Sequence, residues 1–443
     1  MSTAWRNALH YILLFGATGV SLPFAGLWFQ SQGLSGAEIG TLLAAPMLAR
    51  LVTGPMIAVW ADGFALRRTA IAILSVIAAA GYGAAGLVEG FALWLPLWFI
   101  GATAAAAVIP LADVLTLRGA AREGFTFAAP RSAGSLAFVA ANVGMGALLL
   151  RASPDVIIVW LAAAFLIGAL TALTVLPAER VHPGAAPPKR ERFKGLGALV
   201  ADPVFMTAIL AVGAIQATHA FLYGFSAIEW KARGIPESIT GMLWGFSVVV
   251  EVLFMWIVEP WRRRRGIGPW LLLMIGGGAA VVRWVALAFM PPLWLLWPLQ
   301  ALHALSFAAT FLAGLQIVER LAPPANQTAA QTLLSALSSG VLIGLATLMA
   351  GPLYDAYGAL GYLAMAVLAG LGLAAGVAGA GGVGLAPPIP ARAILPHRGR
   401  GTMRSMVEGA CPRAHRQKSS PIGGGGSPPR GETEGAEAGP CRA

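Results

Sequence analysis

Apolar stretches of about 20 residues recur along most of the chain, separated by short segments rich in charge, glycine or proline. A stretch of this length forms a helix that crosses a hydrocarbon core of roughly 30 Å. We predict twelve such helices, at residues 7–29, 37–60, 69–88, 91–115, 132–151, 156–176, 203–228, 237–258, 268–289, 292–318, 328–351 and 358–384. The pattern therefore predicts an all-α membrane protein.

The composition excludes a soluble enzyme. Hydrophobic residues make up 57% of the chain and charged residues 11%, and the mean hydropathy is +0.74, whereas about a quarter of a soluble domain is charged. Both cysteines, Cys411 and Cys441, follow the last apolar stretch. Neither a disulfide framework nor a thiolate metal site can therefore organise the helices, and we expect no metal and no cofactor.

The net charge of +11 is spread over loops. Before residue 385, sixteen loop Lys and Arg residues fall on one side of the predicted helices and three on the other. The side richer in Lys and Arg faces the cytoplasm, which places both termini inside. A nucleic-acid surface would instead gather basic residues on one folded face, so we expect the lipid bilayer, and no nucleic acid, as a partner. Arginine outnumbers lysine 26 to 4, which suggests a GC-rich bacterial genome and hence the bacterial inner membrane.

One long polar loop divides the apolar region. We predict a first six-helix bundle at 1–177, a basic cytoplasmic linker at 178–202, a second six-helix bundle at 203–384, and a tail at 385–443. The tail is rich in Pro, Gly, Ser and charged residues, and it lacks the apolar content that offsets the entropy of ordering. It is predicted to be disordered.

The two halves repeat one another. A shift of 201 residues lays GLSGAEIGTLLAAPMLAR, which begins at Gly33, over GIPESITGMLWGFSVVVE, which begins at Gly234. A shift of 200 residues lays Gly144 over Gly344, in the fifth and eleventh predicted helices. Such spacing indicates two parallel repeats about an axis along the membrane normal.

Two six-helix repeats with a basic central loop resemble the major facilitator superfamily. The stretch GPMIAVWADGFALRR between the second and third helices resembles that superfamily's loop motif, through Gly54, Asp62, Arg67 and Arg68, although Gly63 replaces the arginine that usually follows the aspartate. The resemblance implies a gating role for these charged residues. Simple anchoring of Arg67 and Arg68 at the cytoplasmic surface remains the alternative.

Further stretches resemble the phenylpropionate permease branch of the superfamily. They are THAFLYGFSAIEW, GMLWGFSVVVEV, VVRW and LHALSFAATFLA in the second half and YILLFGATGVSLPF, GLSGAEIG, PLADVL and PRSAGSLAFV in the first. The resemblance implies that the first, fourth, seventh and tenth helices line a central cavity and that the solute is an aromatic carboxylate such as 3-phenylpropionate. Nucleoside or sugar transport stays open, as does export. We add Asp113 and Arg131, from the last two stretches, to the gating residues.

Three of the charged residues inside predicted helices, Glu251, Arg50 and Arg283, are candidates for a role at membrane depth. A charge at membrane depth costs at least ~2.5–3.5 kcal/mol and needs a partner or water. Glu251 has no basic residue within one turn of its own helix, so we predict that it takes up and releases a proton, with a static ion pair as the alternative. Arg50, its repeat mate, would bind a substrate carboxylate or pair with an acid such as Asp113. Arg283 would snorkel to the interface or form a structural pair.

Polar and aromatic residues on the seventh and tenth helices are the remaining candidates. His219 and His303 are predicted to contact the proton or the substrate, and a hydrogen bond between helices is the alternative. Gln216, Tyr223 and Phe307 are candidate substrate contacts, and Asn142 is one too unless it serves in packing.

The sequence thus predicts a secondary active transporter that moves a small organic solute with protons by alternating access, and we expect a monomer. It contains no G-x-x-x-x-G-K-[ST], H-E-x-x-H or G-x-S-x-G motif, so we predict no enzyme and no catalytic residues. The alternatives from other classes are an integral-membrane enzyme and a membrane sensor that has lost transport.

Overall fold

The first half folds into a bundle of long helices. The structure is a computed structural model that describes residues 1–180 and 196–384. Its first half comprises α1 (Thr3–Ser31), α2 (Gly36–Ala61), α3 (Arg67–Ala85), α4 (Phe91–Glu123), α5 (Ala128–Leu148) and α6 (Val156–Thr174). Local signals set several ends: a capping box of Ser35 and Glu38 begins α2, and Gly124 ends α4 at a φ of 75°.

The second half forms a matching bundle in which several predicted spans consist of two or more helical segments, which we call rods. Its helices are α8 (Leu196–Ala201), α9 (Pro203–Ala217), α10 (His219–Ala232), α11 (Glu237–Leu253), α12 (Glu259–Arg264), α13 (Pro269–Ala288), α14 (Leu293–Ala301), α15 (Thr310–Leu321), α16 (Gln327–Ala336), α17 (Ile343–Tyr357) and α18 (Tyr362–Gly384). π-helical turns η1 (Phe254–Val258), η2 (Ala304–Ala309) and η4 (Leu337–Leu342) join α11 to α12, α14 to α15, and α16 to α17, and 3-10 turns η3 (Pro324–Asn326) and η5 (Gly358–Gly361) precede α16 and α18. Turns of the π type often occur at functional sites.

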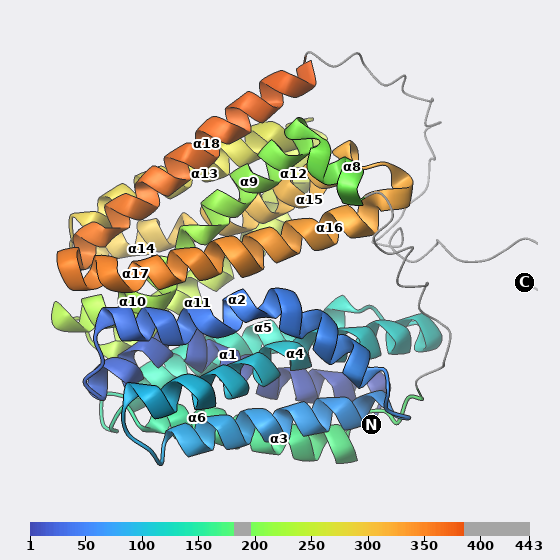
Figure 1. Cartoon of the computed structure of the whole chain (residues 1–443), viewed down its shortest axis with the longest axis vertical. Helices are drawn as coiled ribbons and strands as arrows, with labels where there is room; N and C mark the ends of the chain where they lie inside the picture. Colours follow the sequence, from blue (N-terminus) through green and yellow to red (C-terminus); the bar gives the residue numbers. More distant parts are fainter. Residues whose placement is uncertain (181–195, 385–443) are drawn as a thin grey trace, which may run out of the picture. The chain divides into compact units, whose positions relative to one another are not determined.

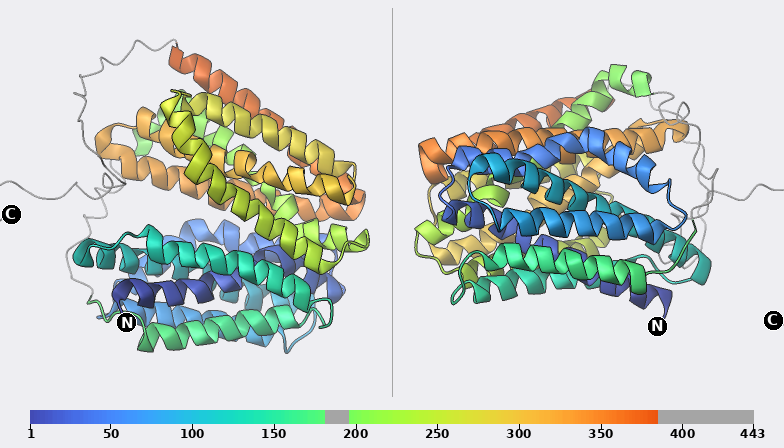
Figure 2. Two further views of the ribbon diagram at one scale, coloured as in Figure 1. Left: turned by 180° about the vertical axis from the view of Figure 1, so that it is seen from behind. Right: turned by 60° about the horizontal axis from the view of Figure 1, so that its bottom comes forward.

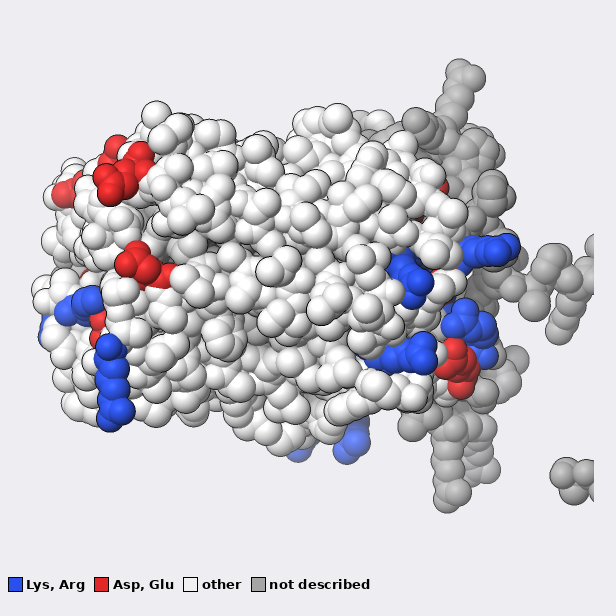
Figure 3. Space-filling view, turned by 90° about the horizontal axis from the view of Figure 1, so that it is seen from below, with Lys and Arg blue, Asp and Glu red and all other residues white. Residues whose placement is uncertain are grey.

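The described helices are long and apolar enough for a membrane. They contain ten candidate spans, of which the tenth, Ala329–Gly382, takes in both the η4–α17 rod and α18. The helix α5, which contains Arg131 and Asn142, is not among the ten. Figure 3 shows charged side chains gathered toward two ends of one face, with mostly uncharged surface between them. The chain is therefore a multi-pass membrane protein, and the count of twelve spans stays a prediction.

Several predicted boundaries need correction. The fourth helix was expected to stop at 115 but continues to Glu123, because its stop signal is Gly124 rather than the first arginine after the apolar run. The eleventh helix was expected to stop at 351 but continues to Tyr357. A short helix, α8, lies inside the predicted linker. Residues 181–195 of that linker and the predicted tail, with Cys411 and Cys441, lie outside the described residues.

The two bundles contact one another along three helix pairs. The helix α2 packs along α17, α5 along α11, and α1 along α10, within one compact unit, Met1–Pro390. Figure 1 shows α2 beside α17 at the left, and the two helices diverge toward the right. The left view of Figure 2 shows α11 approaching α5 at the right, which is the same end seen from behind. We call this end, with the turns at 32–35, 233–236 and 358–361, the paired end, and the opposite end, with 62–66 and 265–268, the basic end.

Glycines permit the closest approaches at the paired end. A Cβ on Gly351 would collide with the carbonyl oxygen of Gly36, and a Cβ on Gly241 would collide with the carbonyl oxygen of Asn142. A Cβ on Gly40 would approach Thr347 and Gly351. A Cβ on its repeat mate Gly241 would approach Asn142 and Gly146. Gly146 and Gly351 therefore occupy matching positions 205 residues apart, five residues more than the sequence shift of 200 for these two helices. The boundaries of the two predicted bundles, at 177 and 203, stay predictions.

Candidate functional site

Two histidines lie at interruptions of the seventh and tenth predicted helices. His219 begins α10 directly after the break at Thr218, and His303 follows the end of α14 and precedes the π-helical turn η2. The break at Thr218 leaves the carbonyl of Gln216 available to His219 Nδ1, 3.0 Å away. Thr218 itself accepts a hydrogen bond from Trp284 Nε1 at 2.7 Å, which ties the break to α13. The irregular backbone thus positions both imidazoles inside the second bundle.

These histidines belong to a cluster of polar side chains from four rods. We call His219, Glu251, Arg283, His303 and Ser306 the buried polar cluster. His303 Nε2 lies 3.6 Å from Glu251 Oε2, and Arg283 Nη1 lies 3.2 Å from His303 Nδ1 and 3.3 Å from Ser306 Oγ. Ser306 Oγ lies 3.0 Å from His219 Nε2. A continuous chain of contacts therefore joins His219 to Glu251.

The hydrogen-bond partners assign one neutral tautomer to each imidazole. Arginine can only donate, so His303 Nδ1 must accept from Arg283, and the ring hydrogen then sits on Nε2, facing Glu251. The carbonyl of Gln216 can only accept, so His219 Nδ1 donates to it and Nε2 accepts from the Ser306 hydroxyl. Both histidines are neutral in this arrangement.

Arg283 corrects a sequence expectation. Of the two expectations for it, snorkelling from a peripheral helix is wrong, because its side chain is 0% exposed and its guanidinium also donates to Gln300; a structural role is the other. Among the described residues it forms no ion pair with a carboxylate, and its Nε has no hydrogen-bond partner. Glu251, reached through His303, is the carboxylate of the cluster. The neutral His303 imidazole therefore lies between the Arg283 guanidinium and the Glu251 carboxylate.

The predicted aromatic and amide contacts border this cluster. The ring of Phe307 stacks on His303 at 5.0 Å between centroids, and Tyr223 lies 5.8 Å from the His219 ring. Gln216 Nε2 donates to the Phe307 carbonyl at 3.2 Å, while its Oε1 is buried without a partner. Glu251, Tyr223 and Phe307 are partly exposed, whereas both histidines and Arg283 are buried. Glu251 is thus the accessible carboxylate of the buried polar cluster, and Tyr223 and Phe307 are accessible residues beside it.

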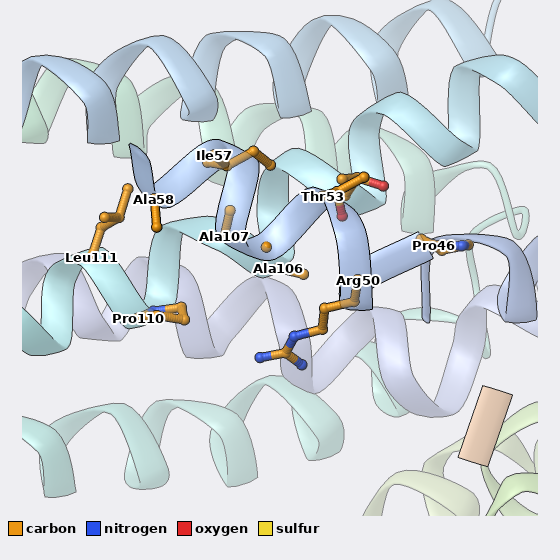
Figure 4. Close-up of a pocket in the computed structure, with 11 residues that line it drawn as sticks. Pro46, Arg50, Thr53, Ile57, Ala58, Ala106, Ala107, Pro110 and Leu111 are labelled. Atoms are coloured by element: carbon orange, nitrogen blue, oxygen red, sulfur yellow. The ribbon is translucent and has the colours of Figure 1, made fainter. Parts of the chain in front are cut away.

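Arg50 lies apart from these residues. It is exposed on α2, and it forms no ion pair or hydrogen bond with any residue that the structure describes, so the expected pair with Asp113 is absent. Figure 4 shows Arg50 alongside Ala106 and Pro110 of α4, at a pocket of about 80 Å³. Thr53 and Thr103 also line that pocket. The guanidinium therefore has no carboxylate partner among the described residues.

Asp113 and Arg131 form a pair in the first bundle. Arg131 Nε lies 3.4 Å from Asp113 Oδ1, and the Tyr11 hydroxyl donates to the same oxygen at 2.6 Å. The guanidinium also lies 4.1 Å from the centroid of the Phe15 ring. The pair thus links α1, α4 and α5.

The loop motif residues join a charged network at the basic end. Arg67 Nη1 lies 3.5 Å from Asp62, and Arg67 Nε lies 3.8 Å from Glu179. Arg118 and Arg122 of α4 also approach Glu179, at 3.6 Å and 3.9 Å. Arg68 instead donates to the Leu176 carbonyl at 3.2 Å. Sequence reasoning missed Glu179, because nothing in its local pattern shows that it faces two other helices.

Asn142 does not join the other candidates. It is 0% exposed, its amide nitrogen donates to the Phe138 carbonyl at 2.8 Å, and its backbone contacts Gly241 of the other bundle. This is the packing alternative considered for it. Within residues 1–180 and 196–384, no group of three His, Cys, Asp or Glu side chains could hold a metal ion.

Comparison with known proteins agrees with this architecture. The profile of the MFS_1 like family matches residues 4–364. The probable 3-phenylpropionic acid transporter of Escherichia coli (strain K12) is 30% identical over 378 residues, which cover 83% of this chain and 95% of that protein. The maltose permease of Geobacillus stearothermophilus is 28% identical over 352 residues, which cover 78% of this chain and 86% of that protein.

A solved structure supports the same fold. The crystal structure of the nucleoside transporter NupG matches with a TM-score of 0.75 at 19% identity, covering 86% of this chain and 99% of that one. Likeness at this identity concerns the fold alone. Because the family profile spans most of the chain and a relative is 30% identical over nearly its whole length, the chain belongs to the major facilitator superfamily, in its phenylpropionate permease-like branch, and is a secondary transporter.

Proposed function

We propose that the protein moves a small aromatic carboxylate together with protons across the bacterial inner membrane by alternating access. The observation that carries the proposal is the pairing of the buried Arg283 with a partly exposed Glu251 through a neutral His303. A carboxyl group that faces the transport pathway can exchange protons with it. The 30% identity to the probable 3-phenylpropionic acid transporter of Escherichia coli supports an aromatic acid as the solute.

The cluster supplies a physical reason for coupling. When Glu251 is ionised, its charge balances that of Arg283, and when it binds a proton, the buried guanidinium is left without a countercharge. A substrate carboxylate held at Arg50 would then supply negative charge to the same pathway, because charges interact strongly, even over a distance, where water is scarce. One proton and one monoanion therefore favour each other's binding. The histidines hold their neutral tautomers and position Arg283 and Glu251.

Arg50 is the proposed anchor for the substrate carboxylate, and Tyr223, Phe307 and Gln216 are the proposed contacts for the rest of the solute. The lack of any ion pair at Arg50 supports this assignment, since an intramembrane arginine without a partner is costly. Asn142 is left out because its side chain is 0% exposed and its amide donates to Phe138 of its own helix, whereas Gln216 Oε1 has no partner among the described residues.

The conformation fits alternating access. The bundles are packed tightly at the paired end, where Gly36 meets Gly351, and diverge toward the basic end (Figure 1). With the basic end in the cytoplasm, as the loop charges predict, we assign this structure to an inward-facing state. The pairs Asp62–Arg67 and Asp113–Arg131 are the proposed gating contacts at that end.

A transport assay tests the proposal. Purified protein in proteoliposomes should accumulate 3-phenylpropionate when an inward proton gradient is imposed, and a protonophore should abolish this accumulation. Maltose and a nucleoside serve as competitor classes. Accumulation of either one with no uptake of aromatic acid would replace the proposed substrate, and uptake that ignores the proton gradient would remove the proposed coupling.

We expect Arg50→Lys to weaken substrate binding about tenfold while leaving the protein folded, because an ammonium cannot reproduce the two-pronged contact of a guanidinium with a carboxylate. Isothermal titration with the aromatic acid measures the affinity. Arg151→Lys, at an exposed loop position, is the matched control and should bind like the parent. An unchanged affinity in Arg50→Lys would contradict the assignment.

A further inference from the structure

A carboxylate of the second bundle caps a helix of the first. Asp355, near the end of α17, accepts two backbone hydrogen bonds from the first residues of α2: Gly36 N donates to Oδ1 and Ala37 N donates to Oδ2, both at 2.7 Å. Amides at a helix N-terminus have no partner within the helix. A negative charge at that position is also favoured by the helix dipole. The contact therefore stabilises the junction of α2 and α17.

The remaining amides of this helix end are satisfied locally. Glu38 N donates to Ser35 Oγ at 3.3 Å, and Ile39 N donates to the Ser35 carbonyl at 3.0 Å. Only Gly36 and Ala37 depend on the other bundle. Separation of the bundles at the paired end would thus leave two amides and one carboxylate to be satisfied by water.

The fit depends on closely approaching backbones. A Cβ added to Gly36 would lie 2.6 Å from Asp355 Oδ1, and one added to Gly40 would lie 3.0 Å from the Thr347 carbonyl oxygen. These contacts lie at the paired end, whereas α2 residues farther along, such as Val52 and Met56, are exposed. The carboxylate thus acts where the bundles are in contact.

The other helix pair has no such contact. The helix α11 begins after Pro236 without a side-chain cap among the described residues, and its first residue, Glu237, pairs with Lys231 of its own bundle at 2.8 Å. Leu150 stands 205 residues before Asp355, the spacing of the matching glycines Gly146 and Gly351. The carboxylate contact is therefore confined to one side of the bundle interface.

We propose that the Asp355 carboxylate is a latch that holds the paired end closed and must release the α2 N-terminus each time that end opens. The latch sets the ratio of paired-end-open to paired-end-closed protein. It rests on alternating access within the proposed function, and it is independent of the substrate and of proton coupling.

The test measures the paired-end distance in full-length protein without substrate. Spin labels at Ser31→Cys and Tyr357→Cys, both exposed positions on opposite bundles, are placed in a background with Cys411→Ser and Cys441→Ser. We expect Asp355→Ala to raise the ratio of long-distance to short-distance populations roughly fivefold, the effect of losing one helix cap. Asp355→Asn keeps one acceptor oxygen and loses the charge, so it should raise the ratio about twofold.

Asp155→Asn is the matched control. Asp155 is an exposed aspartate at the same end, and its carboxylate accepts from Trp28 Nε1 and Gln32 Nε2 of its own bundle. Its replacement should leave the distance distribution unchanged. A folded Asp355→Asn protein with the parent distribution would overturn the latch, and so would an equal shift in Asp155→Asn.

Gly36→Ala provides an independent variant if Asp355→Asn does not yield folded protein. The added methyl group would lie 2.6 Å from Asp355 Oδ1 and 2.8 Å from the Gly351 carbonyl oxygen. It disturbs the carboxylate contact and the helix packing together, so the open population should also rise. An unchanged distribution in Gly36→Ala would overturn the proposal. Failure of transport with a normal distance shift would count against the proposed function and leave the latch standing.

Discussion

Glu251→Gln should abolish proton-driven accumulation of the solute and leave solute exchange within about twofold of the parent. The amide has nearly the same volume as the carboxyl group and mimics its protonated form, so binding geometry is kept while the exchangeable proton is lost. Accumulation under an imposed proton gradient and counterflow between equal pools measure the two activities in the same proteoliposomes. Counterflow in the variant should also lose its dependence on pH.

The control is Glu89→Gln, because Glu89 is an exposed carboxylate between α3 and α4 and should behave like the parent in both assays. Accumulation that persists in Glu251→Gln would show that another group carries the proton. Loss of counterflow as well would show that Glu251 serves binding rather than coupling.

Arg283→Met should abolish transport and destabilise the protein by ~3 kcal/mol, because Glu251 loses the countercharge that we propose for it. His303, Ser306 and Gln300 also lose their common donor. Thermal unfolding in detergent, followed by intrinsic fluorescence, reports the loss. The exposed Arg151→Met is the matched control and should unfold like the parent.

The charge balance itself is tested by combining Arg283→Met with Glu251→Gln. The double variant contains neither charge, so it should recover about 1–2 kcal/mol relative to Arg283→Met alone, as coupled sites do. Strictly additive losses would show that the two groups do not balance one another through His303.

The sequence predicted those site residues that are polar and lie in the middle of an apolar stretch. A carboxyl group or an imidazole in the middle of an apolar stretch is costly and needs a partner, which singled out Glu251, His219 and His303 before any contact was known. The structure places these three in one cluster, with Tyr223, Phe307 and Gln216 around it. Their functional roles stay predictions.

The partners were decided by tertiary structure. The position of a residue along an apolar stretch shows how deep it lies in the membrane, and periodicity shows which face of its helix it occupies. Neither shows which helix packs against that face. Snorkelling to the membrane surface was therefore one of two expectations for Arg283, whose side chain is buried. Asp113 was an alternative partner for Arg50, but it pairs with Arg131.

The sequence by itself determined the membrane class, the helical fold, the repeat and the family, because hydrophobic length and short motifs are local properties of the chain. Only the tertiary structure decided that Glu179 joins the network of Arg67 and that Asp355 reaches the first turn of α2. The second contact spans 319 residues. Its formation depends on two glycine-lined helices meeting at the paired end, which no local pattern specifies.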